Sequence, residues 1–73
     1  KNATLNSAFS DDNGSVYLVG NAGTLFISHD GATSFTDYSQ ADGKAIVNGL
    51  VWHNQLVLVT ETGVRTVNLS ELK

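Results

Sequence analysis

The chain has 73 residues, which is enough for at most one small domain. A domain of this size buries only about 60% of its unfolded surface and is marginally stable alone. The chain contains no cysteine, which excludes disulfides and thiolate metal sites. The net charge is −3, and the four basic residues are scattered. We therefore expect neither a nucleic-acid partner nor binding to an anionic membrane surface.

The apolar runs and the first residue of the chain bear on membrane insertion, processing and location. The longest apolar runs, Val16–Val19 and Leu56–Val59, are far too short to span a bilayer, so no membrane span is expected. The chain starts with Lys1 instead of methionine, which favours a processed protein, an excised fragment or an engineered piece. A mature secreted chain would have lost its signal peptide, and we expect a periplasmic or extracellular location.

The first half of the chain alternates short runs of β-forming residues with turn sequences. Asn13-Gly14 lies between two such runs and is a strong hairpin signal, because both residues tolerate positive φ. Four strands are predicted, at Leu5–Ser10, Val16–Gly20, Thr24–Ser28 and Ser34–Tyr38.

The pattern restarts after a polar loop, Ser39–Lys44. The tail Leu69–Lys73 is interpreted as either a short fourth strand or a frayed end. The further predicted strands are Ile46–Trp52, Leu56–Thr60 and Val64–Asn68.

This restart is an internal repeat. Val16–Thr24 aligns without gaps with Leu56–Val64 at an offset of 40, and Leu5–Phe9 aligns with Val47–Val51 at an offset of 42. The two-residue difference is assigned to the first hairpin. The alternative is chance similarity between two apolar β runs. A period near 40 with four short strands is the size of one β-propeller blade.

We therefore predict an all-β fold of antiparallel four-stranded meanders, about two blades of a β-propeller. Residues 1–41 form the first blade and residues 42–73 a second, incomplete blade.

Ser28–Phe35 resembles the Asp-box, also called the bacterial neuraminidase repeat. The family pattern is Ser, any residue, Asp, any residue or Gly, Gly, any residue, Thr and then Trp or Phe. Ala32 and Ser34 depart from it. The preceding strand resembles the photosystem II assembly factor-like branch of this family. The resemblance implies a β-propeller whose box lies away from the binding face. The residues that match or replace the box positions are Ser28, Asp30, Gly31, Ser34 and Phe35.

The residue types of this segment have a physical role of their own. The Asp30 carboxylate can accept hydrogen bonds from backbone N–H groups of its turn, and Ser28 can add a hydroxyl bond. Gly31 permits a left-handed backbone. Phe35 is expected to fold its ring under the hairpin. We interpret the segment as a turn lock; a ligand or metal role is the alternative.

Candidate chemistry is sparse. Sialidases related to the Asp-box hold the substrate carboxylate with several arginines, whereas Arg65 is the single arginine here. The two histidines, His29 and His53, lack a third metal ligand. The Asp11–Gly14 tip lacks the ligand spacing of a calcium loop. We expect no enzyme activity, no cofactor and no metal.

Binding is the function that remains. Trp52 and His53 are either packing residues or a candidate surface for stacking on a sugar or peptide. Two blades cannot close a ring, since propellers have about four to eight. The expected partners are additional blades, from copies of the chain or from a missing segment, and a protein or peptide. We predict a non-catalytic scaffold or binding module. A segment of a carbohydrate-active or sugar-binding propeller is the alternative.

Overall fold

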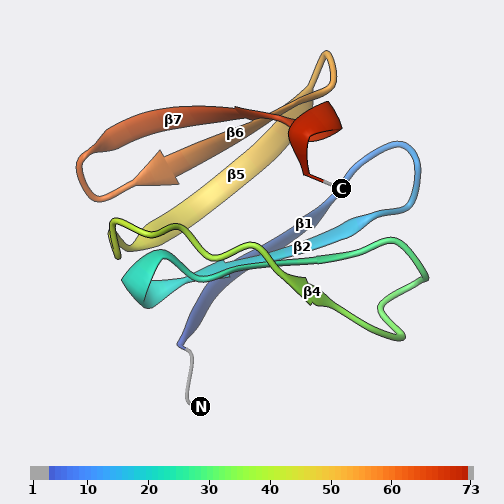
Figure 1. The fold of residues 1–73 in the computed structure, drawn as a ribbon, viewed down its shortest axis with the longest axis horizontal. Coiled ribbons are helices and arrows are strands. Elements are labelled where there is room, and N and C mark those ends of the chain that lie inside the picture. Colours follow the sequence, from blue (N-terminus) through green and yellow to red (C-terminus); the bar gives the residue numbers. More distant parts are fainter. Residues whose placement is uncertain (1–3, 73) are drawn as a thin grey trace.

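The computed structural model describes residues 4–72, and its strands form two antiparallel sheets (Figure 1). The first sheet contains β1 (Leu5–Ser10), β2 (Val16–Gly20), β3 (Leu25–Ser28) and β4 (Thr36–Asp37), in that order, with the short 3₁₀ turn η1 (Asn21–Gly23) between β2 and β3. The second sheet contains β5 (Ile46–Trp52), β6 (Gln55–Thr60) and β7 (Gly63–Asn68), followed by the 3₁₀ turn η2 (Leu69–Glu71). The predicted all-β fold of antiparallel meanders is confirmed, with three strands in the second sheet.

Turn residues with positive φ set the hairpins. Gly14 has a φ of 84° in the five-residue connection between β1 and β2. His53 and Asn54 have φ values of 50° and 60° in the two-residue connection between β5 and β6. A two-residue hairpin with both central residues at positive φ matches the right-handed twist of its strands. The turns therefore bring each pair of strands directly into register.

Strand β4 is shorter than predicted. It covers Thr36–Asp37 only, whereas the sequence pattern predicted Ser34–Tyr38. The hydroxyl oxygen of Ser39 accepts a hydrogen bond from the N–H of Leu25 at 3.2 Å, which interrupts the regular ladder. The chain still follows β3, because the N–H of Tyr38 donates to the carbonyl of Leu25 at 2.7 Å.

The end of the chain forms neither of the two predicted structures. Instead of a fourth strand or a frayed end, the described part of the tail makes η2, and Lys73 lies outside the described residues. The Asn68 side-chain oxygen accepts bonds from the Ser70 N–H at 3.0 Å and the Ser70 hydroxyl at 2.7 Å. This cap satisfies a backbone donor at the start of the turn and ends the sheet there.

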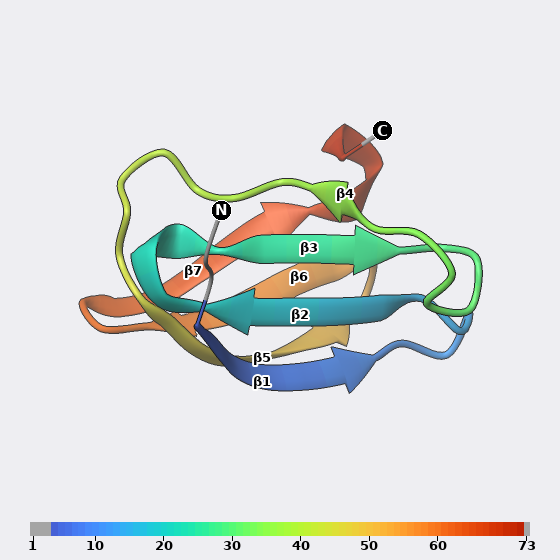
Figure 2. The same ribbon diagram turned by 90° about the horizontal axis from the view of Figure 1, so that it is seen from below.

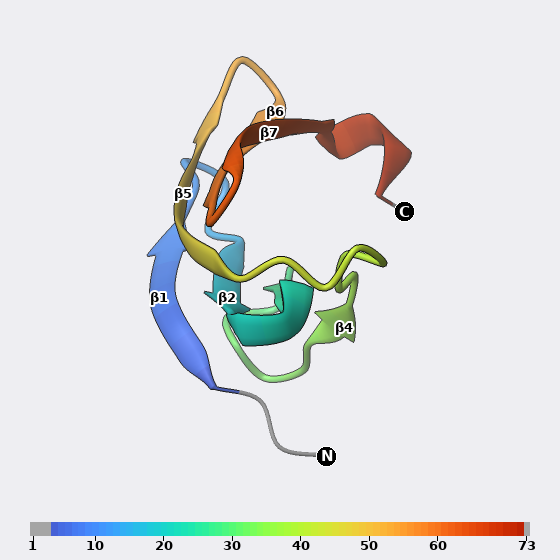
Figure 3. The same cartoon turned by 90° about the vertical axis from the view of Figure 1, so that its left-hand side faces the viewer.

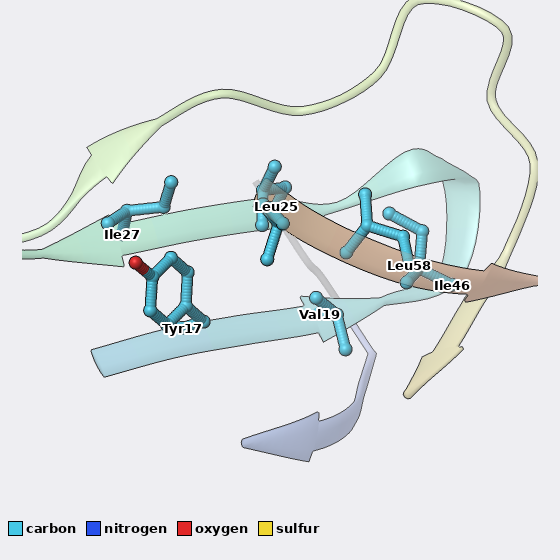
Figure 4. Packing of buried hydrophobic residues seen from close by; sticks show 7 residues of the cluster. Tyr17, Val19, Leu25, Ile27, Ile46 and Leu58 are labelled. Atoms are coloured by element: carbon cyan, nitrogen blue, oxygen red, sulfur yellow. The ribbon is translucent and has the colours of Figure 1, made fainter. Parts of the chain in front are cut away.

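The two sheets face each other across one hydrophobic core. Figure 2 shows the first sheet lying over the second, and Figure 4 shows the side chains between them. The Phe9 ring stacks on Tyr17 with centroids 5.1 Å apart. A Cβ built on Gly49 would lie 2.7 Å from Cζ of Phe9, so this glycine lets the sheets approach. The fully buried core residues are Tyr17, Val19, Leu25, Ile27, Ile46, Leu56 and Leu58.

Strands β1 and β5 lie side by side along one edge of the molecule (Figure 3). The side-chain amide of Asn6 donates to the carbonyl of Ile46 at 3.0 Å. The hydroxyl of Ser7 donates to the side-chain oxygen of Asn48 at 3.1 Å. The first strands of the two sheets are therefore joined by direct hydrogen bonds.

Strand pairing shows the repeat and corrects its predicted alignment. Ala8 pairs with Leu18 as Gly49 pairs with Leu58, so the first strands are offset by 41 positions and not by 42. Both first strands carry a bulge at the same place, between Leu5 and Ser7 in β1 and between Ile46 and Asn48 in β5.

The third strands are offset differently. Val19 pairs with Leu25, whereas Val59 pairs with Val64, so the offset falls from 40 in the second strands to 39 in the third. The ungapped alignment through Thr24 was therefore wrong beyond Gly20. One residue is lost in the first hairpin and one in the second, where η1 has no counterpart. Length changes at hairpin tips are tolerated because they alter loop closure only slightly.

Candidate functional site

Two adjoining clefts open at the end of the molecule where the β1–β2 hairpin, the β5–β6 turn and η2 meet. They have volumes of about 350 Å³ and 390 Å³. Most of the polar side chains that line the first cleft belong to the first sheet and its β1–β2 hairpin. The residues lining the first cleft are Asp11, Asn13, Ser15, Tyr17, Ile27, His29, Asn54, Leu69 and Leu72.

Asp11 organises the hairpin on one side of this cleft. Its Oδ1 accepts hydrogen bonds from the N–H groups of Asn13 and Ser15, both at 2.9 Å. Its Oδ2 accepts the Tyr17 hydroxyl at 2.7 Å. The carboxylate therefore closes its own turn and also fixes the phenol that reaches it from the core.

Ser15 and His29 meet across the β2–β3 pair. The Ser15 hydroxyl and Nδ1 of His29 share a hydrogen bond of 2.7 Å. Val16 pairs with Ser28 in the ladder, so the residues just beyond them, Ser15 and His29, lie opposite each other. Ser15 is buried and His29 is exposed at the mouth of the cleft.

The surroundings of Asp11 and Tyr17 fix the protonation states of these two side chains at neutral pH. Burial opposes the charged form of Asp11, but the bonds from Tyr17, Ser15 and Asn13 outweigh it and lower the pKa of Asp11. Burial and the Asp11 carboxylate together raise the pKa of Tyr17. The site thus presents an ionised carboxylate whose oxygens are occupied by its own hairpin, beside a protonated phenol.

The polar groups that line the first cleft include the amides of Asn13 and Asn54 and the imidazole of His29. Within residues 4–72, no three His, Cys, Asp or Glu side chains gather closely enough to hold a metal ion. Asp11 contacts the backbone N–H of Ser15 and makes no hydrogen bond to the His29 ring. No described acidic group orients His29 as a catalytic base, in contrast to a nucleophile–base–acid triad.

The Asp-box residues form a second, separate cluster at the β3–β4 turn. Oδ1 of Asp30 accepts the N–H of Ser34 at 2.9 Å and the hydroxyl of Ser28 at 2.7 Å. The Ser28 oxygen accepts the N–H of Ala32 at 2.9 Å. Bonds from the Ser34 hydroxyl, the Ser34 N–H and the Ser28 hydroxyl lower the pKa of Asp30 well below its usual value. The contacts are those expected of a turn lock.

Two positions of this turn bear on its backbone and packing. Gly31 has a φ of 73° and Ala32 a φ of 70°, so the alanine occupies a left-handed conformation that favours glycine. Phe35 was expected to fold beneath the hairpin, but it is 39% exposed. The packing of its ring beneath the hairpin stays a prediction.

Replacing Asp30 by alanine is expected to lower the urea midpoint of unfolding, because the Ser34 N–H loses its acceptor. The pKa of Asp30 lies below its ordinary 3.8, so its bonds stabilise the fold above that pH and are lost as pH falls through the folded value. The variant should therefore lose less stability than the parent on acidification.

Urea unfolding of both proteins at neutral and acidic pH measures this effect. Ala32→Gly, in the same turn, is the control: it relieves a left-handed alanine and should leave the midpoint unchanged or raise it. Equal midpoints for the parent and Asp30→Ala would remove the turn-lock interpretation.

The candidate binding pair lies partly outside the clefts. His53 lines the second cleft, whereas Trp52 lines neither and is 64% exposed on the opposite face of the second sheet. The two rings touch edge to face with centroids 3.9 Å apart. The structure thus places Trp52 and His53 in contact and directs them to different surfaces.

The Asp11, Ser15, Tyr17 and His29 cluster was missed by sequence reasoning. A signal existed, because pairing β2 with β3 from the Asn21–Gly23 turn places Ser15 opposite His29. Asp11 also precedes the N–H groups of Asn13 and Ser15 at the spacing of an Asx-type turn.

Comparison with family models, with curated proteins and with solved structures finds no match to this chain. Among the described residues, no helix has both the length and the apolar character needed to cross a membrane.

Proposed function

We propose that this chain is a pair of β-propeller-type blades that acts as a non-catalytic scaffold and binds a protein or peptide partner. The carrying observation is that two antiparallel meanders with the same bulge stack with their first strands, β1 and β5, side by side. Propeller blades repeat such meanders around an axis. The Asp30 turn contacts also support the Asp-box resemblance.

The contacts of the polar residues support a role without catalysis. The guanidinium of Arg65 pairs with the Asp42 carboxylate and donates to Gln40, so the single arginine is engaged outside both clefts. Binding the carboxylate of an acidic sugar, as sialidases do, would need several arginines that are free to contact it. Ser15 is buried and serves the hairpin.

The first cleft suits an extended peptide. Its wall combines amide and imidazole groups from Asn13, Asn54 and His29 with the apolar side chains of Leu69 and Leu72. Peptide backbones offer alternating donors and acceptors to such a wall, and apolar side chains fill its apolar end.

Sugar binding is the second candidate, and one observation favours it. The exposed Trp52 ring offers a flat apolar face that can stack on a pyranose.

Selection of phage-displayed linear peptides on the immobilised chain, beside a printed glycan array, tests these proposals. Leu72→Asp places a charge at the apolar end of the first cleft, and Leu5→Asp, at the far end of β1, is the matched control. We expect selected peptides to bind about tenfold or more weakly to Leu72→Asp and unchanged to Leu5→Asp. Glycan binding that depends on Trp52, without peptide binding, would favour the alternative. Binding of neither class contradicts the proposal.

A further inference from the structure

The two sheets pack through unlike faces. The inner face of the first sheet carries Phe9, Tyr17, Val19, Leu25 and Ile27. The inner face of the second sheet carries Gly49, Val51, Leu56, Leu58 and Val67. When the two repeats are aligned strand by strand, the side that the first sheet buries is the side that the second sheet exposes. The two sheets are therefore stacked in the same orientation and not through like faces.

Strand register shows what the two remaining faces are. The open face of the second sheet occupies the strand positions that form the inner face of the first: Leu50, Val57, Val59, Val64 and Thr66. The open face of the first sheet occupies the positions that form the inner face of the second: Ala8, Ser10, Val16 and Leu18, with Phe26 at the position of Arg65, which pairs with Leu58. The molecule thus exposes both halves of the interface that it already contains.

The open face of the second sheet is apolar and accessible. Leu50 is 53% exposed and Val64 is 68% exposed, and Val59 lies in the strand between them. Contiguous exposed apolar side chains of this kind mark interaction surfaces in soluble proteins.

Side-chain size is also complementary between the open faces. Inside the molecule, bulky Phe9 faces Gly49, which has no side chain to obstruct it. The corresponding positions of the open faces are Leu50 and Ala8. Leu50 is smaller than Phe9, and Ala8 is larger than Gly49. The summed side-chain volume of the Leu50–Ala8 pair is therefore close to that of the Phe9–Gly49 pair. Close-packed interfaces require such compensation.

We propose that the open face of the second sheet binds the open face of the first sheet of another copy of this chain, head to tail. The inference rests on the propeller-blade interpretation proposed above, and the internal interface supplies its geometry. Such a heterologous contact leaves one half-interface free at each end, so copies add in succession until a ring closes or a filament grows.

Sedimentation of the chain over rising concentration, with two blocking variants, tests the proposal. Leu50→Asp places a charge on one open face and Ala8→Asp on the other. The parent should gain mass with concentration, and each variant alone should remain a monomer. An equal mixture of the variants should form dimers and nothing larger, because each supplies the face that the other lacks.

A third variant separates a shaped interface from general stickiness. Ala8→Trp adds apolar surface but removes the space for Leu50, so it should abolish assembly as Ala8→Asp does. Ala41→Asp, in the loop between the sheets, is the control and should assemble like the parent. Far-UV circular dichroism checks that each variant is folded, and Val64→Asp or Ser10→Asp replaces a variant that is not.

Three results would overturn the inference. They are a monomeric parent at every concentration, a variant mixture without dimers, and loss of assembly in Leu50→Asp but not in Ala8→Asp. The last would indicate a symmetric contact between like faces. Peptide capture by the cleft, measured on monomeric Leu50→Asp, continues to report on the proposed function in each case.

Discussion

Replacing Leu58 by alanine is expected to lower the free energy of unfolding by about 2–5 kcal/mol. Leu58 is 0% exposed and belongs to the cluster that joins the two sheets, with Val19 and Leu25 contributed by the first sheet. Removing its side chain leaves a cavity that the facing strands cannot fill. A chain of this length has a total stability of only a few kcal/mol, so a large fraction should be unfolded at 25 °C.

Urea unfolding followed by far-UV circular dichroism measures this loss at a concentration where the chain is monomeric. Leu50→Ala is the matched control, because it removes the same atoms from a side chain that is 53% exposed. Its effect should stay within about 0.5 kcal/mol. Similar losses in the two variants would show that the core does not lie between the sheets as described.

A methyl group at Gly49 is expected to destabilise the fold by about 1–3 kcal/mol through overpacking. The added Cβ would lie 2.7 Å from Cζ of Phe9 and 2.9 Å from the carbonyl oxygen of Val57. The first contact belongs to the interface between the sheets and the second to the ladder within one sheet. Gly49→Ala should therefore push the sheets apart at β1 and β5.

Phe9→Leu separates these two contacts. It shortens the side chain that meets Gly49, so the double variant should be less destabilised than the sum of the single variants, by about 0.5 kcal/mol or more. Full rescue is not expected, because the contact with the Val57 carbonyl stays. Strict additivity in the urea midpoints would show that Phe9 and Gly49 do not touch. The contact between Ala8 of one copy and Leu50 of another, proposed above for the open faces, follows the same rule of matched side-chain size.

Local signals predicted most of the strands and turns. Asn13-Gly14 correctly predicted the first hairpin, because Gly14 adopts the positive φ that its turn requires. Runs of apolar, β-forming residues correctly predicted β5 and β6, because such residues favour extended, partly buried strands. The Asp30 turn contacts also followed from residue type, because a carboxylate beside free backbone N–H groups binds them.

Features that depend on the register between strands could not be predicted from the sequence pattern alone. The offset of the first strands was wrong by one position, because the bulges after Leu5 and Ile46 leave no mark in the apolar pattern. The cluster of Asp11, Tyr17 and His29 needed the β2–β3 register before its members could be placed together.

The stacking of the two repeats on unlike faces can be tested most directly by a nuclear Overhauser spectrum of the monomeric chain. The structure predicts cross-peaks between the Phe9 ring protons and the α proton of Gly49 that points toward them. Cross-peaks from the Phe9 ring to Tyr17 but none to any residue of β5 would contradict it, because the first sheet would then not face the second through this side.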